Sequence, residues 1–207
     1  MATKLQLITE LANTTSKELS NVENWMAFLN SASWQYKYSF EDQVLIYAQR
    51  PDARACADFE TWNEKLKRRI NRGAKGIALL RERGADFYLD HVFDVSDTYK
   101  GIRGVDIKLW EYDDKYDDAI IETLENTFGE LKVNTTLIDS IICAAHNAVE
   151  DNKADYLSEL KYAKEDSFLA DIDELNIDVE FQQTAEVSVA YMVMQRMGLH
   201  PEEVFDS

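Results

Sequence analysis

Cysteine, proline, glycine and long apolar runs are all scarce in this sequence, and each scarcity excludes a class of protein. The two cysteines, Cys56 and Cys143, lie far apart without a C-x-x-C partner, so we expect reduced, ordinary thiols. Two prolines and seven glycines, with no low-complexity tract, leave little room for a long disordered linker. No apolar run reaches the roughly 18 to 20 residues of a membrane span, and the first residues alternate polar and apolar. We therefore expect a soluble cytoplasmic protein with no membrane partner.

Positive charge is scarce overall, but it is concentrated in one part of the chain. The chain carries 22 Lys and Arg against 39 Asp and Glu, a net charge of −17, which argues against nucleic acid because DNA affinity comes largely from cations that displace counterions. Residues 1–83, however, hold 13 cations against 10 acids, net +3, whereas residues 84–207 hold 9 against 29, net −20. This asymmetry predicts two lobes with different functions, and it is typical of a nucleic-acid site or an acidic partner surface.

Helical periodicity and capping signals dominate the first sixty residues. Apolar residues recur at helical spacing over residues 5–11 and 22–29. Ser39 then begins an S-x-x-D capping pattern, and Pro51 ends the helix that follows it. Asp58 can cap another short helix that carries Trp62. Three or four short helices are therefore predicted before any strand.

A small sheet and a second group of helices are predicted after this region. The segments 77–80 and 87–95, with Gly84 between them, indicate an antiparallel hairpin. Helical spacing returns over residues 120–128, 137–145 and 187–197, and Gly198 is a credible C-cap. We predict an α+β protein, mainly helical with a small antiparallel sheet in its N-terminal half, divided into residues 1–100 and an acidic helical lobe of residues 101–207.

A cluster of cations surrounds the glycine-bearing turn Gly73–Gly76. Eight cations and one acid, Glu82, lie within residues 65–83, which is the pattern that phosphate binding needs. The alternative is a solvated helix face, although such faces usually carry mixed signs. Sequence-tolerant binding of single strands also needs aromatic surfaces for base stacking. Trp25 and Trp62 fit a core better than such a surface.

Three aromatic residues between the second and third predicted helices could be either exposed for base stacking or buried in the core. Trp34, Tyr36 and Tyr38 have polar neighbours and no clean helical stripe, so exposure for stacking and burial are about equally supported.

Several separated motifs in the first half carry a family resemblance. They are Phe40-x-x-Gln-x-Leu-Ile-Tyr-Ala-Gln-Arg-Pro-Asp-Ala53, then Trp62, then Gly73-x-Lys-Gly-Ile77, then Val92-Phe-Asp-Val-Ser-Asp-Thr98. In order and spacing, over roughly residues 20–98, they resemble the N-terminal domain of ArdC-type antirestriction proteins. The resemblance implies binding of single-stranded DNA in conjugative elements. Asp97 departs from the pattern, which has Gln before the threonine, and an added carboxylate there could weaken a DNA contact.

The candidate nucleic-acid-binding residues combine the cations, the three undecided aromatics and two residues of the family motif. They are Trp34, Tyr36, Tyr38, Gln49, Arg50, Lys65, Lys67, Arg68, Arg69, Arg72, Lys75 and Arg81.

The domain in this family is usually followed by a zinc metalloprotease, but the required motif is missing here. A zincin needs His-Glu-x-x-His on one helix so that two imidazoles and a general base face one zinc ion. The nearest frame, Ile142–His146, keeps only the second histidine, and Glu186 loosely matches the third ligand. We therefore predict a degenerate, protease-like helical lobe with no catalytic residue, metal or cofactor. The simpler alternative is that His146 is only a polar residue on an amphipathic helix.

Two functions of different classes follow from the sequence. The first is a non-enzymatic accessory of a mobile genetic element that binds single-stranded DNA and acts in antirestriction. The second is an acidic inhibitor that binds a host defence nuclease by protein contact and mimics the charge of DNA. The first predicts salt-sensitive DNA binding, whereas the second predicts affinity for a basic nuclease without affinity for DNA.

Overall fold

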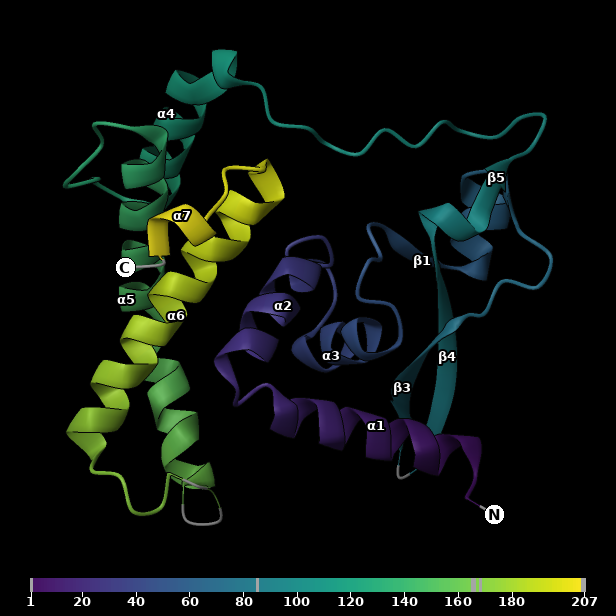
Figure 1. The fold of residues 1–207 in the computed structure, drawn as a ribbon, viewed down its shortest axis with the longest axis horizontal. Coiled ribbons are helices and arrows are strands. Elements are labelled where there is room, and N and C mark those ends of the chain that lie inside the picture. Colours follow the sequence, from purple (N-terminus) through teal and green to yellow (C-terminus); the bar gives the residue numbers. More distant parts are fainter. Residues whose placement is uncertain (1, 85, 165–166, 168, 206–207) are drawn as a thin grey trace. The chain divides into compact units, whose positions relative to one another are not determined.

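The computed structural model describes residues 2–84, 86–164, 167 and 169–205, and it divides the chain into two compact units, Met1–Trp110 and Glu111–Ser207 (Figure 1). The boundary lies ten residues beyond the expected one. Residues 101–110 stay with the first unit because the Val105 amide donates to the Leu66 carbonyl over 2.9 Å. The first unit carries 16 cations against 15 acids, net +1, and the second carries 6 against 24, net −18.

Three capped helices open the first unit. They are α1 (Lys4–Glu18), α2 (Val22–Ala32) and α3 (Phe40–Gln49). The side chain of Ser39 accepts a hydrogen bond from the Asp42 amide, as the capping pattern predicts. α3 ends before Pro51, whose ring cannot continue a helix. The helices predicted in this region are confirmed.

The predicted hairpin forms the centre of a small antiparallel sheet. Its strands β3 (Ile77–Arg83) and β4 (Asp86–Asp94) pair in register from Ile77 opposite Val92 to Arg83 opposite Asp86. A short strand, β1 (Cys56–Asp58), pairs with the other edge of β4, so the strand order is β1-β4-β3. Helices α1 and α3 pack against this sheet around a core that includes Leu45, Ile46 and Leu79.

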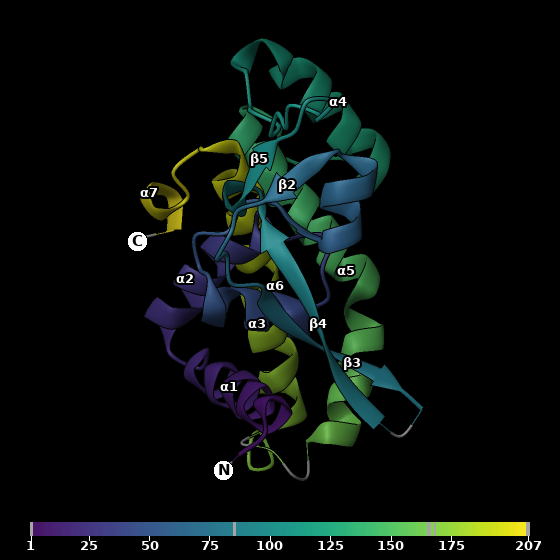
Figure 2. The same cartoon turned by 90° about the vertical axis from the view of Figure 1, so that its right-hand side faces the viewer.

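A second sheet of two strands lies beside the far end of β4 (Figure 2). It consists of β2 (Arg68–Ile70) and β5 (Thr98–Lys100), in which Arg69 pairs with Tyr99. A π-helix (Thr61–Lys65) precedes β2, and a 3-10 turn (Val95–Asp97) precedes β5. The basic stretch is therefore partly a strand, and the alternative of a solvated helix face does not hold for residues 68–70.

The second unit is helical. It contains a 3-10 turn (Asp114–Tyr116), α4 (Asp117–Phe128), α5 (Leu137–Ala163), α6 (Glu174–Met197) and α7 (Glu202–Phe205). Its core includes Ile141, Ala190 and Met194, and Gly198 ends α6 in the left-handed conformation at φ 75°. The predicted α+β class and the predicted helices are confirmed, although α5 and α6 are much longer than the periodic segments that predicted them. Within the described ranges, no helix is both long and apolar enough to cross a membrane.

Candidate nucleic-acid interface

A buried carboxylate fixes the corner where the loop after α3 meets the end of β4. Asp94 is 2% exposed. Its carboxylate accepts a hydrogen bond of 2.7 Å from the Arg54 amide and one of 2.9 Å from the Ala55 amide. It also accepts from the amide and the hydroxyl of Ser96. Burial alone raises the pKa of Asp94, but these hydrogen bonds outweigh burial and hold the pKa below its ordinary value. The loop and the 3-10 turn are therefore held in one geometry.

Arg50 and Asp97 form an ion pair at this corner. The Arg50 guanidinium donates to the Asp97 carboxylate and, over 2.8 Å, to the Ser96 hydroxyl. Asp97 is the position that departs from the family pattern, and its carboxylate holds the neighbouring arginine in place. Of the candidate residues, Arg50 is thus engaged inside the protein.

Arg68 and Arg81 are also bonded within the first unit. The Arg68 guanidinium donates to the Thr98 hydroxyl over 2.8 Å and to the Val105 carbonyl over 3.1 Å. Arg81 donates to Asp42 over 2.7 Å. These partners all belong to residues 1–110, so both arginines are engaged within the first unit.

Gln49 joins α3 to β3. Its amide donates to the Ala78 carbonyl over 2.8 Å and accepts from the Ala78 amide over 2.9 Å. Both amide atoms of this side chain are therefore used in holding a helix to a strand, and the structure gives Gln49 a structural position.

Four of the candidate cations are exposed and lie close together along the chain. They are Lys67, Arg69, Arg72 and Lys75, which we call the cationic segment. Within the part of the chain that the structure describes, no ion pair joins any of the four to a carboxylate. Lys65 is also exposed but lies 3.6 Å from Glu60.

The cationic segment is held in shape by a close backbone approach. Lys67 has a positive φ of 53°, and its carbonyl oxygen lies against two glycines. A Cβ atom added at Gly101 or Gly104 would come within 2.7 Å of that oxygen, so only glycine allows the turn to pack there. Just after β2, the Asn71 amide donates a hydrogen bond of 2.8 Å to the Asp97 carbonyl, which extends the pairing between β2 and β5 by one residue.

The aromatic candidates lie in three different environments. Tyr36 is 67% exposed, whereas Tyr38 is half-buried and its hydroxyl donates to the Cys56 carbonyl over 2.9 Å. Burial raises the pKa of Tyr38 above its ordinary value. The Arg54 guanidinium lies over the Trp34 ring, 4.3 Å from its centroid. Trp62 is buried, as predicted, and donates to the Phe93 carbonyl.

Sequence reasoning missed Tyr99 and Arg54. Tyr99 is 54% exposed and pairs with Arg69 across β2 and β5, so an open ring and an open guanidinium lie on neighbouring strands. Residues in direct register on antiparallel strands share one face of the sheet. The three residues of β5 are too few for a sequence signal at Tyr99, and nothing local connected Arg54 with Trp34.

Both cysteines are free, as expected. Burial, together with the nearby carboxylate of Asp94, raises the pKa of the Cys56 thiol to about 12. This thiol is therefore protonated at neutral pH and is a poor nucleophile.

The helix pair α5 and α6 brings together the two residues that loosely matched zincin ligands. His146 Nδ1 and Glu186 Oε1 lie 2.8 Å apart. Gln182 donates to Glu186 over 2.8 Å and to Glu150 over 3.0 Å, so the pair belongs to a polar network between the helices. In the described ranges, no group of three or more His, Cys, Asp or Glu side chains could hold a metal ion.

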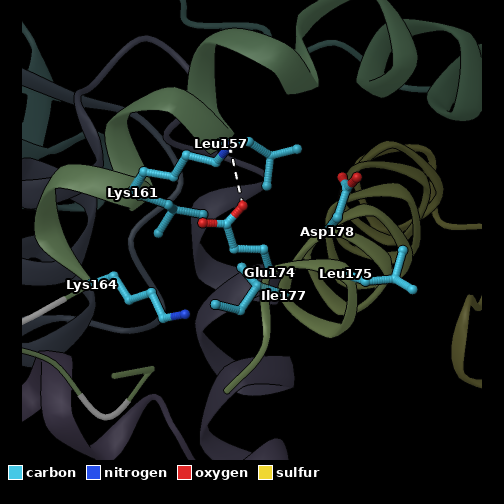
Figure 3. A pocket seen from close by; sticks show the side chains of 8 residues that line it. Leu157, Lys161, Lys164, Glu174, Leu175, Ile177 and Asp178 are labelled. Atoms are coloured by element: carbon cyan, nitrogen blue, oxygen red, sulfur yellow. Dashed lines mark ion pairs between the residues drawn. The ribbon is translucent and has the colours of Figure 1, made fainter. Parts of the chain in front are cut away.

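A cavity of about 270 Å³ lies between the end of α5 and the start of α6 (Figure 3). Leu157, Leu175 and Ile177 line it, and at its edge Lys161 lies 3.5 Å from Glu174. Its lining is largely aliphatic and offers no aromatic ring, so it is not suited to stacking with a base.

Comparison with known proteins found no matching family model, curated protein or solved structure. The resemblance to ArdC-type proteins therefore stays a prediction.

Proposed function

We propose that this chain is a non-enzymatic module that binds single-stranded DNA through the cationic segment. This is the function expected of an antirestriction accessory protein of a mobile genetic element. One observation carries the proposal: Lys67, Arg69, Arg72 and Lys75 are exposed with no carboxylate paired to them in the described ranges, although the chain as a whole is strongly acidic. Phosphate binding requires such unpaired cations, because each contact gains by releasing counterions.

The exposed ring of Tyr99 is evidence that the DNA bound is single-stranded, not duplex. It lies exposed and in register with Arg69, so phosphate and base contacts are available on one face of the β2–β5 pair. Unpaired bases stack on such rings whatever their sequence, whereas the bases of a duplex are already stacked.

The proposal is tested by titrating labelled single-stranded and duplex oligonucleotides at several salt concentrations. The variant Arg69→Ala/Arg72→Ala removes two exposed cations and leaves Arg68, which holds β5, in place. We expect the affinity for single strands to fall at least about tenfold, and the slope of log K against log salt to decrease by about 1.4. The matched control is Lys17→Ala, which removes an exposed cation at the end of α1 and should leave the slope unchanged. Equal binding by the wild type and the double variant would contradict the proposal.

A second candidate function rests on the charge of the second unit. Its net charge of −18 would suit a surface that enters the DNA groove of a host nuclease. This function predicts no affinity for oligonucleotides and salt-sensitive binding of a basic nuclease, which the same titration with a nuclease in place of DNA detects.

A further inference from the structure

Residues of the three N-terminal helices and of the loop that follows α3 line a cleft of about 740 Å³. Figure 1 shows where these helices lie in the first unit. The lining of the cleft includes the rings of Trp34 and Tyr47, the amide of Asn30, the carboxylate of Asp52 and the guanidinium of Arg54. No residue of the cationic segment lines it. The cleft is therefore a separate feature from the proposed phosphate-binding residues.

The stack of Arg54 on Trp34 gives this cleft a flat, positively charged wall. The guanidinium carbon lies 4.3 Å from the centroid of the indole ring, and Trp34 is half-buried while Arg54 is exposed. The guanidinium thus lies over the indole on the side of an exposed residue, where a planar ligand can approach it. Unpaired bases stack on arginine planes as well as on aromatic rings.

A buried carboxylate anchors the backbone of Arg54 at the edge of the cleft. Asp94, which is buried, accepts from the Arg54 amide over 2.7 Å, so the backbone of this residue cannot shift freely. No ion pair in the described ranges holds the Arg54 guanidinium away from the cleft. A preorganised platform loses little conformational entropy on binding.

The charges of the cleft favour a base over a phosphate group. Arg54 is the cation in its lining, and the carboxylates of Glu18 and Asp52 line it as well. Two carboxylates repel a phosphate, but they can accept hydrogen bonds from the amino groups at a base edge, as can the amide of Asn30.

A short chain of contacts connects the cleft with the cationic segment. Asp52 lies 3.7 Å from Arg50, which is paired with Asp97. The carbonyl of Asp97 accepts from the amide of Asn71, and Arg72 follows directly. The cleft and the cationic segment therefore both belong to the first unit and are joined by these contacts.

We propose that the Trp34–Arg54 stack is the platform for an unpaired nucleobase, which enters the cleft while the backbone of the strand is held by the cationic segment. This inference rests on the proposed function, since it names the part of the polynucleotide that the cleft binds. It assigns a binding role to Arg54, Tyr47 and Asn30.

The test compares a single-stranded oligonucleotide of about 12 nucleotides with an abasic strand of the same length and charge. The full chain is used, as wild type and as Arg54→Lys, which keeps the charge but removes the plane. The matched control is Arg83→Lys, because Arg83 also lies over an aromatic ring, that of Tyr88 at 5.4 Å, but outside the cleft. We expect the wild type and the control to prefer the base-bearing strand by about five- to 100-fold. Arg54→Lys should lose part of this preference, and the part that remains comes from stacking on Tyr99.

The outcomes separate the two proposals. Equal affinity of the wild type for both strands, or an unchanged preference in Arg54→Lys, would overturn the base platform and leave the phosphate-binding role standing. Failure of the wild type to bind either strand would overturn the proposed function and the platform together. Loss of preference in Arg83→Lys as well as in Arg54→Lys would also count against the cleft, because the effect would then not depend on its geometry.

Discussion

At the level of single residues, the buried carboxylate of Asp94 holds two loop segments of the first unit together. The carboxylate of Asp94 is only 2% exposed, and it accepts hydrogen bonds from backbone amides of two segments that are far apart in sequence. Burying a charge costs several kcal/mol unless hydrogen bonds compensate it, and here the bonds are strong enough to lower the pKa of the side chain. The backbone position of Arg54 is therefore held in part by this carboxylate.

Asp94→Asn is therefore expected to destabilise the first unit by about 2–4 kcal/mol near neutral pH. Because the pKa of Asp94 is lower in the folded state, its contribution is fully present above the unfolded value of about 3.9 and is lost as pH falls through the folded value. The difference between wild type and variant should then shrink in acid. Urea unfolding followed by tryptophan fluorescence at several pH values measures it.

The control for this prediction is Asp86→Asn at the start of β4, where the side chain is exposed. A change within about 0.5 kcal/mol is expected there. A similarly small change for Asp94→Asn would mean that the hydrogen bonds at the corner add no stability.

At the level of elements, one side chain adds hydrogen bonds to the apolar packing between α3 and the edge strand β3. Gln49 lies at the end of α3 and satisfies both backbone groups of Ala78 in β3, a residue that is 1% exposed. The family motif places a glutamine here, and the sequence suggested a DNA contact. In the structure, the amide nitrogen of Gln49 donates to Leu45 and Ala78, and its amide oxygen accepts from Ala78, so we expect a structural role.

Gln49→Ala is expected to cost about 2–4 kcal/mol, because it leaves a buried amide and a buried carbonyl without partners. The affinity of the folded protein for oligonucleotides should stay within about twofold of the wild type. Chemical denaturation and titration at low temperature measure the two quantities. Gln183→Ala on the exposed side of α6 serves as the control for stability. Weakened binding with unchanged stability would restore the role of Gln49 in DNA contact.

At the level of the whole molecule, two units of opposite electrostatic character share one chain. The first is close to neutral at net +1 and carries the exposed cations, whereas the second has a net charge of −18. Charges of this size raise or lower the local concentration of a polyanion over distances of about 10 Å at 0.1 M salt. If the proposed DNA binding holds, we expect the charge of the acidic unit to oppose it at low salt and to be increasingly screened as salt rises.

A fragment of residues 1–110 is expected to bind single-stranded oligonucleotides at least about threefold more tightly than the full chain at low salt, with the difference vanishing near 1 M salt. Circular dichroism of the fragment verifies that it is folded, and fluorescence anisotropy gives the affinities. If the fragment folds but binds more weakly, the interface includes residues beyond 110.

The sequence by itself determined the features that depend on near neighbours. Capping residues such as Ser39, the end of α3 at Pro51 and the left-handed cap at Gly198 need only a few adjacent residues, so periodicity and turn chemistry located them. The α+β class followed from the same signals. The strands β1, β2 and β5 were missed because each has three residues, which is too short for alternation to be recognised.

Only the tertiary structure decided which cations are available. Arg50 and Asp97 are 47 positions apart, and Arg81 and Asp42 are 39 apart, yet each pair is bonded in the fold. In the sequence these arginines look the same as Arg69 and Arg72, because charge and local pattern do not encode long-range partners. Folding brings carboxylates from distant segments to some cations and leaves others exposed to solvent, and that difference separates structural arginines from candidate binding residues.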